Sequence, residues 1–479
     1  MLLRPSQSVA AALPTSRRAP AAQTPGDSFA PLDETIRQAM TSAGIPGVAV
    51  GVLYPGGQYL AGFGVTNVES PQPVDADTLF QIGSITKTMT MAACLRLVEQ
   101  GRLDLTTPIR QYVPDLRLSD PSAAAMITLQ DCLTHTSGLP ADHFVTMGGG
   151  DDALARFAAS LDQIPFVLPP GEWASYCNTA FSLAGRVLEV ARDQTYEQAI
   201  RELLLEPLGM TRSTFFAEEA ILYPTAAGHT LIEDQAYLQR PWNLPRTANA
   251  AGGLVASASD VLAYASLWLN DGLAPSGERL LRPETLAQIE SPQSHQPDDL
   301  GTFGLAWGLP DLSGIRLLAH DGGTAGQNAR LWIEPDQGVA VCVLTNVQDG
   351  SAVLGSAAGW VVQNLLGFDV KPPATPSPLP RDGATLAAHA GVYSNPGESI
   401  YTVSVRDDGL EMIYQQDDPY FGSVVPAIPP EPTRQLVFAS PTAVFATDPP
   451  GGGRGAFLPG PGGRPLGLFW GGRFYRRAG

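Results

Sequence analysis

Apolar residues recur every three or four positions in four stretches of this chain, a spacing that places them on one face of a helix. The four stretches are residues 28–43, 88–100, 261–269 and 351–366. Between residues 105 and 220, similar patterns alternate with long loops. These patterns predict single helices near both ends of the region and a mainly helical segment in its middle.

Short runs rich in β-branched and aromatic residues predict strands between these helices. Residues 48–54 and 59–66 are separated by Pro55-Gly56-Gly57, which predicts a hairpin. Three more runs follow much later in the chain, at residues 317–320, 329–333 and 339–344. We therefore expect helices to flank a sheet that is assembled from both ends of this region.

The composition changes sharply at residues 371–381, where five prolines favour a stiff extended linker and a domain boundary. Residues 382–479 hold short β-type runs broken by glycine and proline, which predicts a small β-rich domain. These runs are residues 400–405, 410–414, 435–439, 443–446 and 466–475. Residues 1–27 predict a flexible tail, so residues 28–370 form the expected main domain.

The overall composition is typical of a globular protein with a large core, since 44% of the residues are hydrophobic. A formal net charge of -18 opposes binding to a phosphate backbone, so we expect no nucleic-acid partner. The C-terminal end is locally basic, which we interpret as a solvated face. Its basic residues are Arg454, Arg464, Arg473, Arg476 and Arg477.

The four cysteines stand far apart with no Cys-x-x-Cys pair, which indicates buried free thiols rather than a disulfide framework or a metal site. No apolar run reaches the length of a membrane span. Pro14 interrupts the short apolar run in the tail, so the tail is not a convincing signal peptide. We expect a cytoplasmic protein without a cofactor or metal, and the oligomeric state stays open.

Lysine occurs only at Lys87 and Lys371, and Lys87 lies three residues after Ser84. On a helix these two positions share a face, so the Ser84 hydroxyl and the Lys87 amine can be neighbours. Burial can make a lysine amine neutral and able to accept a proton, whereas arginine stays charged. The N-terminal end of a helix also stabilises a developing alkoxide. The pair therefore predicts an activated serine nucleophile.

Two further segments are candidates for the same cleft. Tyr176-Cys177-Asn178 precedes an apolar helical run, so a phenol and an amide two residues apart can face one cleft from a turn. His320-Asp321-Gly322-Gly323-Thr324 follows a predicted strand, where the glycines let backbone N–H groups approach a substrate closely. We expect both segments to lie beside the nucleophile.

The set of Ser84-x-x-Lys87, Tyr176-x-Asn178 and His320-Asp321-Gly322, in this order, resembles the serine β-lactamase and penicillin-binding-protein family. The resemblance is to its branch of class C β-lactamases, DD-peptidases and esterases. It implies an α/β (α+β) serine β-lactamase-like fold, with an antiparallel sheet flanked by helices and a mainly helical subdomain. Residues 382–479 resemble the small lipocalin-like β domain that is appended to many such hydrolases.

By this resemblance, Ser84 attacks a carbonyl while Lys87 and Tyr176 share the general-base and general-acid work. The resemblance leaves open which of the two is the principal base. It implies that Asn178 orients Lys87 or a substrate amide. The backbone N–H groups of Ser84 and Gly323 would form an oxyanion hole, and an acyl-enzyme would form and then be released.

The remaining motif residues receive supporting roles from the same resemblance. Gly322 and Thr324 are expected to line the substrate site with Gly323. His320 replaces the lysine of a Lys-Thr-Gly motif and can hydrogen-bond Tyr176 or a substrate carboxyl group. Because this replacement removes a fixed positive charge, we expect poor penicillin hydrolysis. We also expect His135 to brace the cleft and Cys177 to pack behind the turn.

The expected function is a cofactor-independent serine hydrolase that cleaves an ester or amide, including peptides with D-residues, through a Ser84 acyl-enzyme. The expected partner is a small-molecule or peptide substrate. A β-lactamase or DD-peptidase is one alternative, and acyl transfer to an amine, including peptide ring closure, is another. A penicillin-binding or sensor protein with little turnover is the alternative of a different class. The family resemblance also allows a secreted or periplasmic location.

Overall fold

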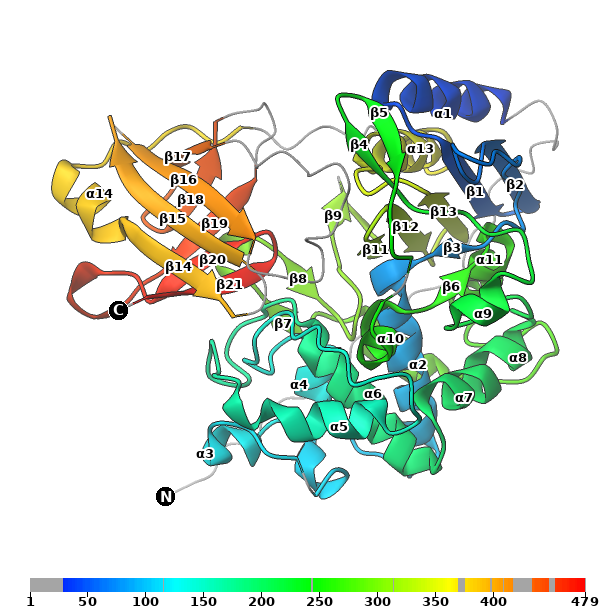
Figure 1. Cartoon of the computed structure of the whole chain (residues 1–479), viewed down its shortest axis with the longest axis horizontal. Coiled ribbons are helices and arrows are strands. Elements are labelled where there is room, and N and C mark those ends of the chain that lie inside the picture. The colour runs from blue at the N-terminus through cyan, green and yellow to red at the C-terminus, as the bar shows by residue number, and fades with distance from the viewer. Residues whose placement is uncertain are drawn as a thin grey trace, which may run out of the picture.

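The computed structural model describes most of the chain, and two parts are distinct in Figure 1. The described residues are 29–114, 116–242, 244–312, 314–368, 375–396, 399–407, 409–416, 433–447 and 453–478. We call residues 29–368 the α/β region and residues 391–477 the barrel. The predicted tail and Lys371 lie outside the described residues, and the predicted domain boundaries stay predictions.

A five-stranded antiparallel sheet forms the centre of one half of the α/β region. Its strand order is β11-β12-β13-β1-β2, so a hairpin from the start of the region lies beside three strands from its end. The bounds are β1 Gly47–Tyr54, β2 Gly57–Gly64, β11 Leu318–Thr324, β12 Gln327–Glu334 and β13 Val339–Thr345. This arrangement confirms the predicted sheet and its assembly from both ends of the region.

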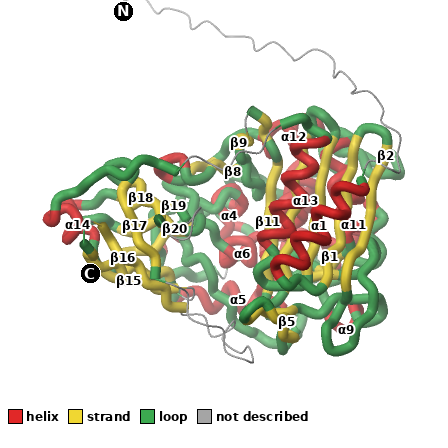
Figure 2. Tube along the Cα trace, turned by 90° about the horizontal axis from the view of Figure 1, so that it is seen from above, coloured by secondary structure: helices red, strands yellow, loops and turns green. Residues whose placement is uncertain are grey.

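Helices cover both faces of this sheet because its strands are apolar on both sides. Val48 of β1 packs in the cluster that contains helices α1 (Ala30–Ala43) and α13 (Ser351–Asn364). The next residue, Ala49, points to the other face, where the cluster contains helix α11 (Ala258–Leu269). Figure 1 shows α1 and α13 on one side of the sheet and α11 on the other, and Figure 2 shows α1 and α13 lying across the strands.

The other half of the α/β region is mainly helical, as predicted. Its central helix is α2 (Thr86–Glu99), which packs against α6 (Asn178–Arg192). Most residues of α2 are buried, and its threonine hydroxyls bond to backbone carbonyls, as when Thr90 Oγ1 donates to Ala250 O at 2.8 Å. Ser84 therefore leads into a helix that is largely buried.

The remaining elements of the α/β region are short. The helices are α3 Pro121–Ala124, α4 Leu129–Leu133, α5 Ala153–Ala159, α7 Tyr196–Ile200, α8 Glu206–Leu208, α9 Ala217–Ala220, α10 Asn249–Gly252 and α12 Pro283–Glu290. The strands are β3 Phe80–Gln81, β4 His229–Ile232, β5 Gln235–Leu238, β6 Val255–Ala256, β7 Ser294–His295, β8 Thr302–Phe303, β9 Asp311–Leu312 and β10 Ile315–Arg316.

One strand boundary differs from the sequence-based expectation. The segment from His320 to Thr324 was expected to follow a strand, but it lies inside strand β11. Its glycines pair with β12, with Gly322 opposite Ala329 and Gly323 opposite Asn328. Glycine usually weakens a strand, yet it is favoured where another backbone approaches closely, and that is the case here.

The C-terminal part is a closed barrel of eight strands, β14 to β21, which confirms the predicted small β-rich domain. Closure comes from β14 (Gly391–Asn395), which pairs with both β15 and β21. The other strands are β15 Ser399–Arg406, β16 Gly409–Gln416, β17 Arg434–Phe438, β18 Ala443–Ala446, β19 Arg454–Leu458, β20 Gly467–Trp470 and β21 Arg473–Arg477, and helix α14 (Gly383–His389) precedes them.

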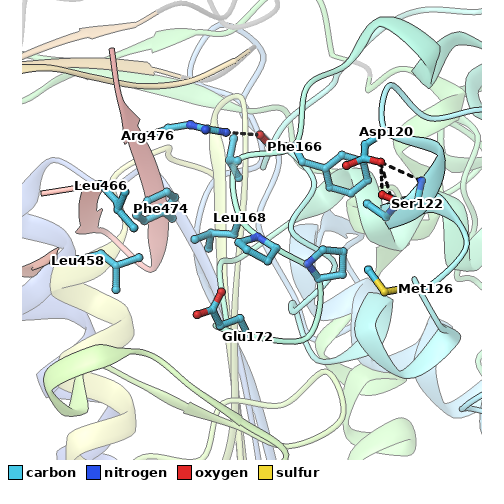
Figure 3. A pocket seen from close by; sticks show the side chains of 14 residues that line it. Asp120, Ser122, Met126, Phe166, Leu168, Glu172, Leu458, Leu466, Phe474 and Arg476 are labelled. Atoms are coloured by element: carbon cyan, nitrogen blue, oxygen red, sulfur yellow. Dashed lines mark hydrogen bonds between the residues drawn. The ribbon is translucent and has the colours of Figure 1, made fainter. Parts of the chain in front are cut away.

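The barrel packs on the helical half of the α/β region through a small apolar cluster. Val167 and Leu168 from the loop before α6 are buried against Phe469 and Phe474 from β20 and β21. Beside this cluster lies a hollow of about 420 Å³ whose two walls come from the two parts. Figure 3 shows Phe474 and Leu466 of the barrel facing Leu168 and neighbouring residues of the loop. The barrel is thus docked by burial of apolar surface.

Candidate active site

Ser84 lies in a single 3₁₀ turn, Gly83–Ile85, that leads directly into α2. This turn packs backbone to backbone against the edge strand β11. A Cβ atom on Gly83, whose φ is +52°, would lie 2.6 Å from the backbone N of Gly323, and one on Gly322 would lie 2.0 Å from the carbonyl O of Ile82. Glycine is therefore required on both sides, and the contact brings the backbone of Ser84 close to that of Gly322 and Gly323.

Lys87 is fully buried in the first turn of α2. Its Nζ lies 3.0 Å from Ser84 Oγ and donates to the carbonyl O of Ala251 at 2.6 Å. Burial lowers the pKa of the Lys87 amine to about 7, with the negative charge of Asp142 opposing this shift and the positive charge of Arg473 adding to it. Near neutral pH a large share of Lys87 is therefore the free amine, which can accept a proton.

Tyr176 reaches the same serine from the segment before α6. Its phenol hydrogen-bonds the Ser84 side chain, and its ring centroid lies 4.8 Å from Lys87 Nζ. Burial raises the pKa of the Tyr176 phenol well above its usual value, and the Ser84 hydrogen bond and the Arg473 charge offset only part of the rise. The phenol therefore keeps its proton near neutral pH and can donate it.

Asn178 is the first residue of α6 and is oriented by a residue that the sequence pattern did not single out. Its Nδ2 donates to Asp142 Oδ1 at 2.5 Å. Both side chains are buried, with 8% of Asn178 and 4% of Asp142 exposed. This contact leaves the Asn178 carbonyl oxygen directed away from Asp142, on the side of the amide that can meet a substrate N–H group.

His320 lies in β11 beside Tyr176, and the two ring centroids are 6.3 Å apart. Its Nδ1 lies 2.6 Å from the carbonyl O of Asp321, and since a carbonyl only accepts, Nδ1 carries the proton. Burial lowers the pKa of His320 to about 4, with the charge of Lys87 adding to the effect. His320 is therefore neutral near pH 7 and offers its Nε2 as an acceptor.

His135 and Cys177 fix the backbone on which Tyr176 and Asn178 stand. The backbone N of Cys177 donates to His135 Nδ1 at 3.0 Å, and the His135 ring lies 4.4 Å from the Tyr176 ring. The Cys177 sulfur accepts from the backbone N of Ala180 at 3.3 Å and so caps α6. Burial lowers the pKa of His135 well below its usual value and raises the pKa of Cys177 to about 11. Both groups are therefore uncharged supports.

A cavity of about 270 Å³ opens beside Ser84, and Lys87, His135, Cys177 and His320 lie outside its lining. Four of the predicted site residues line it, namely Ser84, Tyr176, Asn178 and Gly323. Lys87 lies beneath Ser84 and is closed off from the cavity. Thr324, at the end of β11, is outside the cavity lining, and its buried hydroxyl has no hydrogen-bond partner among the described residues.

Arg473 from the barrel also lines the cavity, so the interpretation of the C-terminal arginines as a solvated face is wrong for Arg473, whereas Arg454, Arg464 and Arg476 are exposed. The Arg473 side chain is 20% exposed, and its Nη2 lies 2.9 Å from Asp142 Oδ2. Its guanidinium carbon lies 5.4 Å from the centroid of the Tyr176 ring. No local pattern in the sequence distinguishes Arg473 from its neighbours, because its role comes from a contact between residues 331 positions apart.

Two general properties concern the described part of the chain. Within these ranges, no group of three or more His, Cys, Asp or Glu side chains is placed to hold a metal ion. No helix in the same ranges is both long and apolar enough to cross a membrane. The absence of a cofactor and the cytoplasmic location stay predictions.

Comparison with known proteins identifies the family of this chain. A family model described as Beta-lactamase matches residues 32–363, more than half of the chain, and the chain therefore belongs to this family. Penicillin-binding protein 4 of Amycolatopsis lactamdurans is 31% identical over 369 residues, which cover 74% of this chain and 94% of that protein. Unguisins hydrolase ungD' of Aspergillus campestris is 25% identical over 442 residues, 81% of this chain and 80% of that protein.

A solved structure shares the fold over most of this chain. The crystal structure of SurE superposes with a TM-score of 0.73 at 24% identity and covers 94% of this chain and 98% of that one. SurE was also solved with D-Leu. The family and the fold confirm the predicted resemblance and the expected class of enzyme, a serine hydrolase related to β-lactamases and penicillin-binding proteins.

Proposed function

We propose that this protein cleaves an ester or amide through an acyl-enzyme on Ser84, with Lys87 as the general base and Tyr176 as the general acid. The observation that carries the proposal is the 3.0 Å separation between Lys87 Nζ and Ser84 Oγ, with Lys87 buried and its pKa near 7. A base with a pKa close to the working pH combines a free amine with a useful affinity for the proton.

Acylation then proceeds as follows. Neutral Lys87 takes the proton of Ser84 as Oγ bonds to the substrate carbonyl carbon, and the negative charge on the carbonyl oxygen is held by the N–H groups of Ser84 and Gly323. Tyr176 donates its proton to the leaving oxygen or nitrogen as that bond breaks. Water then attacks the acyl carbon, and the ionised Tyr176 takes a proton from that water. Lys87 returns its proton to Ser84 Oγ as the acyl–oxygen bond breaks, so the acid is released and both groups recover their starting states.

The cavity favours a small or peptide acyl group that carries its own hydrogen-bonding groups. Asn178 presents an amide to the cavity, and the walls near Leu244, Ala248 and Ala251 are apolar. Relatives of this chain include a hydrolase of unguisins and a penicillin-binding protein, and SurE was solved with D-Leu. We therefore place peptides with D-residues first among the substrates to test.

Efficient β-lactam hydrolysis is disfavoured by the electrostatics of the site. A neutral His320 supplies no positive charge to a substrate carboxylate, and the nearby guanidinium of Arg473 is already balanced by Asp142. A DD-peptidase and transfer of the acyl group to an amine use the same acyl-enzyme, so they differ from hydrolysis only in the substrate and in the group that attacks second.

Intact-mass analysis with a fluorophosphonate probe tests the proposal, followed by turnover of a short-chain aryl ester, a D-Ala-D-Ala peptide and a chromogenic cephalosporin. We expect one adduct that maps to Ser84, ester and peptide turnover well above cephalosporin turnover, and loss of all three activities in Ser84→Ala. Product mass with and without an added amine shows which nucleophile completes the reaction. A wild-type protein that forms no Ser84 adduct and has no Ser84-dependent turnover would contradict the proposal and favour a docking protein.

A further inference from the structure

Two backbone segments of the active site are fastened to the barrel rather than to the α/β region alone. The backbone N of Tyr176 donates to Gly472 O at 2.9 Å, and the backbone N of Phe474 donates to Ser175 Oγ at 3.0 Å. The backbone N of Ala141, next to Asp142, donates to Asn395 Oδ1 at 3.0 Å. The barrel therefore holds the residues that carry the phenol and the carboxylate of the site.

The same contact surface contains a charge pair that joins the two parts inside the cavity. Asp142 bonds Asn178 through Oδ1 and Arg473 through Oδ2, so one carboxylate faces a motif residue and a barrel residue at once. Only 6% of the Asp142 side chain and 20% of the Arg473 side chain are exposed. Charges in such a place are screened weakly by water and act on their neighbours over several ångströms.

We propose that the barrel completes the active site through this pair, with Arg473 and Asp142 acting as positioning residues that set the orientation of Asn178 and the charge state of the Lys87–Ser84 pair. The inference rests on the proposed function, because it takes Lys87 as the base. It assigns the barrel a part in catalysis: without Arg473, the carboxylate of Asp142 would stand uncompensated beside the reacting groups.

The Asp142–Arg473 pair controls the charge state of Lys87 because the other titratable groups that face Lys87 are uncharged near neutral pH. From the segments before α6, Tyr176 and Cys177 face Lys87 with their protons retained, because burial raises the pKa of both. The histidines that face it, His135 and His320, are neutral because burial lowers the pKa of both. Asp321 acts on His320 but is paired with Arg330 on the outer side of β11. Near neutral pH, Asp142 and Arg473 are thus the opposing charges that act on Lys87.

Removing the charge of Arg473 and removing the charge of Asp142 must then shift the pH dependence of acylation in opposite directions. Acylation needs the free amine, so its rate rises with pH through the pKa of Lys87. Removing the positive charge in Arg473→Gln favours protonated Lys87, and the rise moves to higher pH by about one unit. Removing the negative charge in Asp142→Asn, which keeps an oxygen acceptor for Asn178, moves the rise to lower pH by a similar amount.

The test is the rate of fluorophosphonate labelling of Ser84 between pH 5 and 9, followed by intact mass, in the full-length wild type, both single variants, the double variant and Arg473→Lys. We expect opposite shifts in the two single variants, a double variant close to the wild type, and a near-wild-type curve for Arg473→Lys. Circular dichroism and thermal melts identify any variant that does not fold. If one variant does not fold, the isosteric Asp142→Asn and the charge-keeping Arg473→Lys still test the proposal.

A matched control pair is Asp152 and Arg156, which lie 2.8 Å apart but with side chains 62% and 50% exposed. Asp152→Asn and Arg156→Gln should leave the labelling curve unchanged. Shifts of the same sign in Arg473→Gln and Asp142→Asn, or no shift in either, would overturn the inference while leaving the acyl-enzyme proposal intact. A wild type that is not labelled at Ser84 would overturn both.

Discussion

The α/β region and the barrel contribute to the active site in different ways. The α/β region supplies every proposed reacting group, and Ser84 and Lys87 are one helical turn apart in the chain. The barrel supplies no reacting group, yet Gly472 and Arg473 contact Tyr176 and Asp142 across about 300 positions of sequence. The comparison indicates that the pairing of Ser84 and Lys87 is encoded locally, whereas their surroundings depend on how the barrel packs on the α/β region.

The largest expected effect is in the α/β region, at the nucleophile. Ser84→Ala removes the atom that bonds to the substrate, and we expect a loss of turnover of at least about 10⁴-fold. The substitution removes one hydroxyl from a partly exposed position, so the melting temperature should change little. Parallel assays of turnover and thermal melting check this prediction, and residual turnover near the wild-type rate would show that another residue carries the reaction.

Lys87→Arg is the next test, because it keeps the positive charge and removes the base. A guanidinium does not release its proton near neutral pH, so we expect acylation to fall by about 10²–10⁴-fold, the range typical of a lost general base. Burst-phase ester kinetics measure the acylation step directly. Near-wild-type acylation would show that the Ser84 proton leaves through Tyr176 alone.

Gly322→Ala tests the backbone contact between β11 and the Ser84 turn. A new Cβ would meet Ile82 O at 2.0 Å, so the strand must move away, with a stability loss of roughly 1–3 kcal/mol. The N–H group of Gly323, which we propose for the oxyanion hole, moves with the strand, and we expect kcat to fall by about 10²-fold or more.

The matched control for this change is Gly355→Ala in the exposed face of α13, where a Cβ has open space. This variant should gain about 0.5–1 kcal/mol of stability, because alanine is the better helix former, and keep full activity. Urea unfolding and steady-state kinetics on both glycine variants provide the comparison, and equal behaviour of the two would refute the role of the backbone contact.

A smaller effect is expected from the barrel at Asn395. This buried side chain accepts from the backbone N of Ala141 and donates to the carbonyl O of Phe474, so it ties the two parts together. Asn395→Ala leaves both backbone groups unpaired, and we expect about 1–3 kcal/mol of lost stability with a several-fold fall in kcat. Unchanged stability and kcat would show that the docking of the barrel does not depend on this link.

The smallest effect should come from Arg476, on the same strand as Arg473. Arg476 is exposed, and its Nη1 donates to the carbonyl O of Phe166 beside the hollow in Figure 3. Arg476→Gln should leave activity, its pH dependence and stability within experimental error. An effect as large as that of Arg473→Gln would mean that the general positive charge of the strand matters rather than the buried pair.

Much of the fold was predictable because its signals are local. The helical spacing near residues 28–43 and the two hydrophobic runs around Pro55-Gly56-Gly57 correspond to α1 and the β1–β2 hairpin. Ser84 and Lys87 could be paired from sequence alone, because neighbouring positions on one helical turn fix their distance. Of the barrel, the runs with clear β-branched patterns were predicted, including residues 443–446, which match β18.

Other features depend on contacts that no local pattern records. Strands β14 and β19 were missed because each holds or begins with glycine, and their stability comes from barrel pairing with distant strands. The glycines of β11 were expected to follow a strand, because the close approach of the Ser84 turn that favours glycine inside the strand is a tertiary contact. Asp142 and Arg473 were not distinguished for the same reason, because each acquires its role only when the barrel docks.

The most direct test of the central claim is the mass of the protein during turnover of a slowly hydrolysed ester, with peptide mapping of the modified residue at several pH values. We predict a transient acyl adduct on the peptide that contains Ser84, formed at a rate that rises with pH through a value near 7, as the pKa of Lys87 requires. An acyl group on another residue, or acylation of Ser84 at a rate independent of pH between 5 and 9, would contradict the account.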